Sequence, residues 1–424
     1  MTALALATAI CGVGVFFYLR FRTMLNPPSI HALAFAAQLA IYAVMQRYAA
    51  GQGLNFGVMA DVTNVIRGYL IASVSFGLPW LLLGKRDGYL KIDSITPSVR
   101  DIRSFKVVLA CEIILLFLAA SVAIGLVGFP LGSMLAGRFD VNRMNEALRS
   151  LPPGLLALML WIAILLSLQL ATAITFRRHY RLSRPQLAGV GVAILLSSIW
   201  EAKRQVLLIM LLLTALFMVA DRARRTQLWR VLFGLAVAFA AFWVVYVAVQ
   251  FVRVGNVDSG PFYLELILSS MWPLLNLDRV MAFTQGTGQL YSLVAGLIPN
   301  RFFGHGYEGF QSVLFEPTSS VSYVLYAYFD FGYFGIAGAA FVFGLVALWF
   351  SSLFKQSITG VQVRALVLWT CLSSPIYAHA FSINYFLIPV SLLFLIRGFS
   401  GGRMYVRSTA HAPKRGMAVV RPGT

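Results

Sequence analysis

Basic side chains recur in the segments that separate the long apolar runs of this chain. Eight of them fall in three such segments, at Arg138, Arg143, Arg149, Lys203, Arg204, Arg253, Arg279 and Arg301. A guanidinium binds phosphate through paired hydrogen bonds of fixed geometry. Eight cations beside one membrane surface would therefore suit a ligand that carries a pyrophosphate group. The alternative is that each cation only pairs with a nearby carboxylate, as Arg279 would with Asp278.

Three charges are crowded into one short turn. Glu201, Lys203 and Arg204 lie between two short apolar runs, in the sequence SIWEAKRQVLL. Charges at or just below a membrane interface are costly and tend to mark functional sites. The pattern favours Lys203 and Arg204 as ligand-binding residues, although a polar hairpin that only ends two helices would have the same sequence.

Candidate proton acceptors lie in the longest segment between apolar runs, at 252–332. They are His305, Glu308 and Asp330. An imidazole or a carboxylate can take a proton from a hydroxyl group as a general base. We therefore take these three as candidate catalytic residues, with the alternative that the lone histidine is incidental.

Two tyrosines of the same segment, Tyr307 and Tyr323, offer apolar ring faces to a sugar. Packing in a core or an interface would explain them equally well. The sequence has no HExxH or Walker A motif, and no cluster of histidines and carboxylates with metal-ligand spacing. We expect chemistry without a metal ion or a cofactor.

Membrane-spanning helices must position these residues. Of the 424 residues, 59% are hydrophobic and 12% are charged, whereas soluble proteins are about half apolar and a quarter charged. This excludes a soluble enzyme and predicts an all-α, polytopic transmembrane bundle of about eleven spans, between ten and thirteen. The apolar runs lie near 3–19, 29–46, 65–84, 107–128, 155–176, 185–200, 205–220, 231–251, 333–354, 365–381 and 384–397.

The distribution of charge predicts the orientation. With the N-terminus outside, 24 of the 34 basic residues fall in inside segments, while most acidic residues fall outside. This is the asymmetry of the positive-inside rule. The net charge of +19 therefore reflects topology, with anionic-lipid contact as an addition, and does not indicate a nucleic-acid partner.

The predicted spans divide the chain into four parts. Residues 1–251 form the N-terminal transmembrane helices, about eight in number, and 333–397 form the C-terminal ones. Between them, 252–332 is a large outside loop with interfacial or re-entrant helices, because 262–283 is amphipathic. The tail 398–424 is basic and rich in Gly, Ser and Pro, which predicts disorder.

Two sequence patterns occur in an order that is typical of one family. The charged turn and the span after it read EAKRQVLLIMLLLTALF, and the long loop ends in PTSSVSYVLYAYFDFGYFGIAG directly before a span. In this order the chain resembles the Wzy-type oligosaccharide repeat-unit polymerases, the O-antigen and exopolysaccharide polymerases of bacterial inner membranes. The resemblance covers most of the chain as topology and about 200–220 and 295–345 as sequence pattern.

The resemblance implies glycosyl transfer at the periplasmic face. A growing glycan on undecaprenyl pyrophosphate would move onto a newly flipped lipid-linked repeat unit. Arg204 and Arg301 would bind the pyrophosphate, Arg138 or Arg143 would add contacts, and His305 would be the base. The N-terminus would be periplasmic and the C-terminus cytoplasmic. The lipid-linked glycan and membrane lipid are the expected partners, and a chain-length regulator and a flippase remain open.

Two other functions fit the same sequence. An O-antigen ligase shares the topology and the chemistry, but delivers the glycan to the lipid A core. A flippase or transporter for lipid-linked saccharides would be no enzyme, and would place ionisable groups near the bilayer midplane on broken helices. The expected position of the charges in outside loops favours the enzyme.

Overall fold

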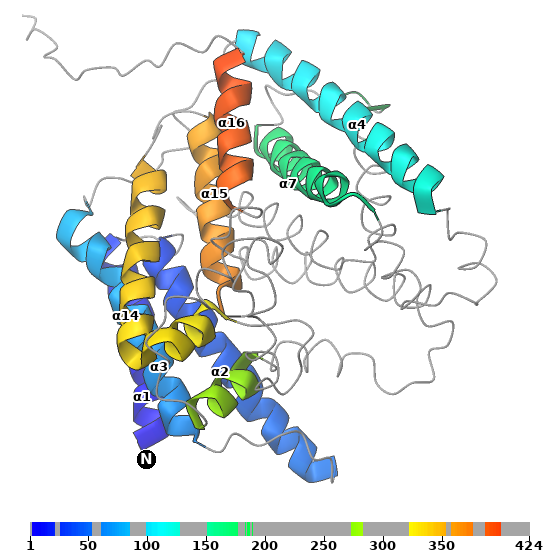
Figure 1. The fold of residues 1–424 in the computed structure, drawn as a ribbon. Coiled ribbons are helices and arrows are strands. Elements are labelled where there is room, and N and C mark those ends of the chain that lie inside the picture. Colours follow the sequence, from blue (N-terminus) through cyan, green and yellow to red (C-terminus); the bar gives the residue numbers. More distant parts are fainter. Residues whose placement is uncertain are drawn as a thin grey trace, which may run out of the picture.

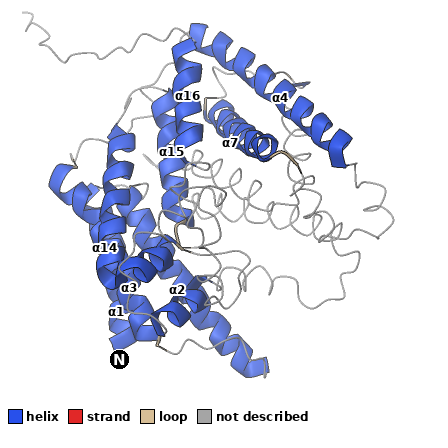
Figure 2. Cartoon of the chain, viewed as in Figure 1, coloured by secondary structure: helices blue, strands red, loops and turns tan. Residues whose placement is uncertain are grey.

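The computed structural model describes the chain in a series of separate stretches. They are residues 2–21, 26–52, 61–84, 99–127, 151–176, 183, 185–186, 189, 273–282, 322–352, 358–375 and 386–399. Within these stretches the regular structure is all helical (Figure 2). Within the same stretches, five helices are long and apolar enough to cross a membrane. This agrees with the helical membrane protein that the composition predicts.

The longer helices of the described residues are labelled in Figure 1. They are α1 (Thr2–Phe21), α2 (Pro27–Gln52), α3 (Val62–Leu83), α4 (Val99–Val127), α7 (Pro153–Thr175), α14 (Tyr323–Ser352), α15 (Ile358–Ser373) and α16 (Ile388–Phe399). A short helix at 273–282 is drawn without a label. The predicted apolar runs at 185–200, 205–220 and 231–251 lie wholly or largely outside the described residues, so the total of eleven spans stays a prediction.

One group of helices consists of α1, α2, α3 and α14. α1 packs against α2 and α3, and α3 lies along α14 (Figure 1). Glycines permit the closest approaches, because a Cβ at Gly344 would overlap the Phe76 carbonyl and one at Gly77 would overlap the Phe17 ring. In a bilayer, where water drives no burial between helices, such small residues favour tight helix packing.

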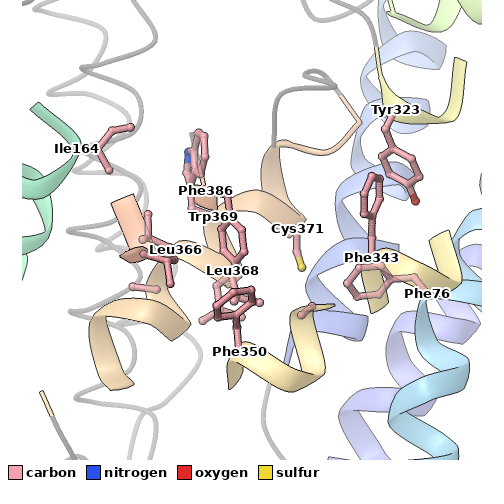
Figure 3. Close-up of a cluster of buried hydrophobic side chains, with 14 of the residues drawn as sticks. Phe76, Ile164, Tyr323, Phe343, Phe350, Leu366, Leu368, Trp369, Cys371 and Phe386 are labelled. Atoms are coloured by element: carbon pink, nitrogen blue, oxygen red, sulfur yellow. The ribbon is translucent and has the colours of Figure 1, made fainter. Parts of the chain in front are cut away.

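A second group consists of α4 and α7, and α15 connects it to the first. α15 contacts α2 and α14 on one side and α7 and α16 on the other. Figure 3 shows the apolar junction, in which Ile164 of α7, Leu366 and Trp369 of α15, and Phe350 of α14 are all buried. Phe350 meets Phe386 edge-on, with 5.1 Å between ring centroids. One continuous core therefore joins the two groups.

Helix α14 is broken near its beginning. Phe331 and Gly332 leave helical geometry, and Gly332 has φ of 60° and ψ of −142°, a combination that only glycine adopts easily. The stretch before the break packs back along the stretch after it, since a Cβ at Gly335 would overlap the Ala327 carbonyl. The sequence predicts a single span from 333 to 354. The structure shows in addition a buried half-helix that begins at Tyr323 and precedes the break.

Candidate functional site

Three segments that are far apart in the sequence meet where α3 begins. They are the N-terminal end of α3, helix 273–282 and the break in α14. The backbone N–H of Asp61 donates a hydrogen bond of 2.9 Å to Oδ1 of Asp278, across 217 residues of chain. Asp278 is buried. Part of the long segment 252–332 is therefore docked on the helix bundle.

Asp61 fixes the start of α3. It is the N-cap residue, and its Oδ1 accepts a hydrogen bond of 3.1 Å from the backbone N–H of Asn64. Its Oδ2 accepts a second bond of 2.7 Å from the Asn64 side-chain amide. A carboxylate at a helix N-terminus satisfies free N–H groups and interacts well with the helix dipole. The carboxylate is thus held in one position at the edge of the bundle.

Arg67 and Tyr333 lie on the same polar surface, which we call the α3–α14 polar site; it consists of Asp61, Asn64, Arg67, Asp278 and Tyr333. Arg67 is exposed, and its Nη1 donates a bond of 3.3 Å to Oδ1 of Asn64. The Tyr333 hydroxyl donates a bond of 3.4 Å to the Asn64 carbonyl. The Arg67 guanidinium and the Asp61 carboxylate both lie near this hydroxyl. A carboxylate, a guanidinium and a phenol hydroxyl therefore lie close together at this site.

A glycine lets the segments come so close together. A Cβ at Gly68 would lie 2.9 Å from Cε of Met281 and 3.2 Å from Cδ1 of Ile336, with Val324 also nearby. Met281 belongs to helix 273–282, and the other two lie on either side of the break in α14. The absence of a side chain at Gly68 thus brings both described parts of 252–332 against α3.

Three of the residues predicted from the sequence are described by the structure. Arg279 directly follows Asp278 in helix 273–282 and is half-buried. Asp330 is 1% exposed and occupies the last position before the break in α14. Tyr323 is also 1% exposed and lies at the far end of the half-helix. The structure therefore brings Arg279 and Asp330 to the elements of the α3–α14 polar site.

Tyr323 lies deeper in the bundle than these two residues. Its hydroxyl is 3.0 Å from Nε2 of His31, and its ring meets Phe343 edge-on with centroids 4.9 Å apart (Figure 3). The ring therefore packs in the core described by the structure, and its role as a contact to a sugar stays a prediction.

The other predicted residues lie outside the described part of the chain. They are Arg138, Arg143, Arg149, Lys203, Arg204, Arg253, Arg301, His305, Tyr307 and Glu308. Among the described residues no three His, Cys, Asp or Glu side chains come together as a metal site would require. The roles assigned to these ten residues stay predictions.

Sequence reasoning misses most of the α3–α14 polar site, although Asp61 carries a signal. An aspartate directly before a long apolar run is typical of a helix N-cap, and Arg67 is one of the ten basic residues that the predicted topology places outside. The sequence indicates Asp278 only as a partner for Arg279. Its bond to Asp61 depends on the tertiary fold.

Protein-family models, curated proteins and solved structures were compared with the chain, and none of them matches it.

Proposed function

We propose that this chain is an inner-membrane glycosyltransferase that polymerises oligosaccharide repeat units linked to undecaprenyl pyrophosphate. The reaction takes place at the periplasmic face and serves the synthesis of O-antigen or exopolysaccharide. In the proposed topology about eleven helices span the membrane, the N-terminus is periplasmic and the C-terminus is cytoplasmic. The α3–α14 polar site then lies at the periplasmic end of the bundle.

The observation that supports this proposal best is the docking of 252–332 on α3. Helix 273–282 and the start of α14 both contact the N-terminal end of α3 through Asp61 and Gly68. A long loop between spans is usually functional when it is ordered. Of the predicted acids and cations of this loop, Arg279 and Asp330 lie on the docked elements beside α3. In the proposed topology a lipid-linked substrate would meet both bilayer and water there.

The proposed reaction uses these groups as follows. A sugar hydroxyl of the acceptor attacks the anomeric carbon of the donor glycan and gives its proton to a general base, for which His305, Glu308 and Asp330 are candidates. The bond between the anomeric carbon and the pyrophosphate oxygen breaks, and undecaprenyl pyrophosphate leaves with the electron pair. Preorganised arginines stabilise the growing negative charge in a partly dry site, each by about a hundredfold in rate.

Deletion of the gene tests the proposal. Loss of long surface chains with a single repeat unit retained would support polymerisation. If long lipid-linked polymer instead accumulates without reaching the lipid A core, the protein is a ligase. Complementation with Arg204→Ala or Arg301→Ala should give protein that inserts normally but makes no long chains. Long chains from both variants would refute the pyrophosphate assignment.

A specific observation favours a second candidate function, transport of the lipid-linked saccharide. Discontinuous helices with ionisable groups near the break are typical of transporters, and Asp330 is buried at the break of α14. The deletion experiment separates the two functions, because loss of transport would leave no lipid-linked repeat units at the periplasmic face.

A further inference from the structure

Helix α4 carries an acidic residue in the middle of its apolar stretch. Glu112 lies 10 residues after the start and 14 residues before the end of the membrane-spanning window Ile102–Leu126. At 1.5 Å per residue these separations are about 15 and 21 Å along the helix. Glu112 is 5% exposed, so its carboxyl is remote from water at both ends of the helix.

Among the described residues, the side chain that faces Glu112 is polar and carries no charge. The Glu112 carboxyl faces the Gln169 side chain of α7, although neither oxygen makes a hydrogen bond of ordinary geometry within the described structure. The amide of Gln362 on α15 donates bonds of 3.2 Å to Oε1 of Gln169 and of 3.0 Å to Oγ1 of Thr172. Thr172 in turn donates 2.7 Å to the Leu168 carbonyl. We call Gln169, Thr172 and Gln362 the amide network.

The charged residues of the surrounding described helices are placed elsewhere. The segment Pro153–Thr175 of α7 contains no charged residue, and α15 contains only Arg364. Arg364 donates bonds of 2.9 and 2.8 Å to the Ser351 carbonyl. On α4, Lys106 lies six residues before Glu112, about 9 Å along the axis, and Arg103 is exposed a turn further away. Of the described cysteines, Cys111 directly precedes Glu112 on α4, and Cys371 lies nine residues beyond Gln362 on α15.

We infer that Glu112, held between α4, α7 and the amide network, is an intramembrane proton-binding site. The inference goes beyond the proposed glycosyl transfer and does not depend on it. An ionised carboxylate at this depth would lack both water and a cation among the described side chains, which is very unfavourable. A bound proton removes the charge, and the amide network supplies neutral dipoles that a neutral carboxyl can face.

Glu112 and the amide network lie on α4, α7 and α15. Binding or release of the proton therefore affects how these helices pack together. Release of the proton leaves a charge that must reach water or a cation, so the ionised form favours a conformation in which α4 separates from α7. Proton binding favours the packed conformation described here. The bound proton therefore stabilises the packing of α4 against α7, as a ligand stabilises the conformation that it binds.

An apolar carbodiimide tests the inference on the full chain in native membranes. Dicyclohexylcarbodiimide reacts with protonated carboxyls in apolar surroundings: the acid O–H adds across a C=N bond, and the adduct rearranges to a stable N-acylurea without losing an atom. Trypsin would release residues 107–138, in which Glu112 is the only acidic residue. Mass spectrometry should find one adduct on this peptide. The absence of an adduct would overturn the inference.

Two variants make the assignment unambiguous. Glu112→Gln should reduce the adduct to background and leave the melting temperature of the purified protein unchanged, because a neutral amide replaces a neutral acid of the same shape. Cys111→Ser removes the neighbouring thiol, which carbodiimides also attack, and should leave the adduct in place. A large loss of stability in Glu112→Gln would indicate a structurally required carboxylate and would overturn the inference.

Two further reagents distinguish a buried proton site from a carboxylate that is open to water or bound to sodium. A water-soluble carbodiimide should not label the peptide, and equal labelling by both carbodiimides would show that Glu112 is reached from water. Excess sodium chloride should not protect Glu112. Protection by sodium would mean that the oxygens of Glu112 and the amide network bind a metal cation in place of a proton. Either result would contradict a proton-binding site.

Discussion

Among single residues, Asp61 connects the most interactions of the α3–α14 polar site. Its carboxylate caps α3 and its backbone N–H is bound by Asp278. Both acids are thus occupied in holding the segments together. Arg67 differs, since it is exposed and donates its hydrogen bond to the neutral Asn64 side chain. Arg67 is therefore the residue of this site that is best placed to meet an anionic ligand.

Under the proposed function, we expect Arg67→Ala to reduce polymer synthesis about a hundredfold, the effect of losing one cation that would lie beside the pyrophosphate. The thermal stability should hardly change, because the side chain is exposed and truncating it leaves no buried charge. The measurement is the distribution of polysaccharide chain lengths after complementation, with protein level as the reference. Arg103→Ala, an exposed arginine of α4, is the matched control and should keep long chains. Normal chain lengths in Arg67→Ala would remove this residue from the site.

Asp278 allows a prediction on stability. Asp278→Ala removes the acceptor of the Asp61 N–H and should destabilise the protein by about 1–3 kcal/mol, the effect of a hydrogen bond to a charged group. Asp278→Asn keeps an oxygen in the same place and should cost less. Thermal unfolding in detergent measures both. Equal loss in the two variants would show that the charge, and not the hydrogen bond, stabilises the docked segment.

The sequence predicts the positions of some candidate site residues better than those of others. It selects Arg279 and Asp330 by charge and position, and the structure places both on the elements that form the α3–α14 polar site. It selects Tyr323 by its aromatic ring, and the ring lies in the core against Phe343. The type of a side chain indicates which chemistry it can perform. Which other residues it contacts depends on the tertiary fold, which brings distant parts of the chain together.

At the scale of elements, the break in α14 decides where the α3–α14 polar site lies. The half-helix that begins at Tyr323 is turned back by Phe331 and Gly332, which places Tyr333 next to α3. A straight helix through this region would carry Tyr323 away from His31. The polar site and the buried position of Tyr323 therefore both depend on one backbone turn.

Gly332→Ala tests this turn. A side chain at positive φ with ψ of −142° should cost about 1–3 kcal/mol of stability and shift Tyr333. Gly338 of the same helix has open space around its Cβ position, so Gly338→Ala should instead stabilise the helix by up to about 1 kcal/mol. Melting temperatures of the two variants measure the difference. Similar melting temperatures would contradict the broken geometry of α14.

The sequence predicts the spans better than the break. Apolar length alone locates α1 to α4, because the bilayer sets how many residues a helix needs. The sequence YVLYAYFDFGYFGIAG is apolar and aromatic on both sides of the turn, so its hydropathy does not change at Gly332. The turn is made by the backbone of Phe331 and Gly332 and brings Gly335 close to Ala327. Hydropathy detects neither feature.

At the scale of the whole molecule, the fold brings together parts that the linear order separates. α3 packs mainly along α14, and helix 273–282 contacts the N-terminal part of α3 at Asp61 and Gly68. The charge distribution predicts the side of the membrane for each segment, because that rule acts on local sequence. It contains no information on whether an outside loop lies on the bundle, since this depends on contacts such as that of Gly68 with Met281.

Paired cysteines test the docking in membranes. In a chain whose Cys11, Cys111 and Cys371 are replaced by Ala, Gly68→Cys and Met281→Cys should be joined by a short bifunctional thiol reagent, because the two side-chain positions are in contact. The product is detected by cleaving the chain between the two positions and looking for fragments that stay linked. Gly338→Cys, whose Cβ faces open space, is the control partner for position 281. Equal linking of both pairs would contradict the docked position.

The pairing of α3 with α14 also affects how the protein is made. α3 ends at Leu83 and α14 begins at Tyr323, so α3 enters the membrane about 240 residues before its main partner exists. At 5–20 residues per second, the ribosome needs roughly 12 to 50 s to make the chain between them. During that interval Arg67 and Asn64 have no Tyr333 beside them, and helix 273–282 is made only in the last part of it. The cell's insertion machinery must therefore keep an incomplete bundle in place until late in synthesis.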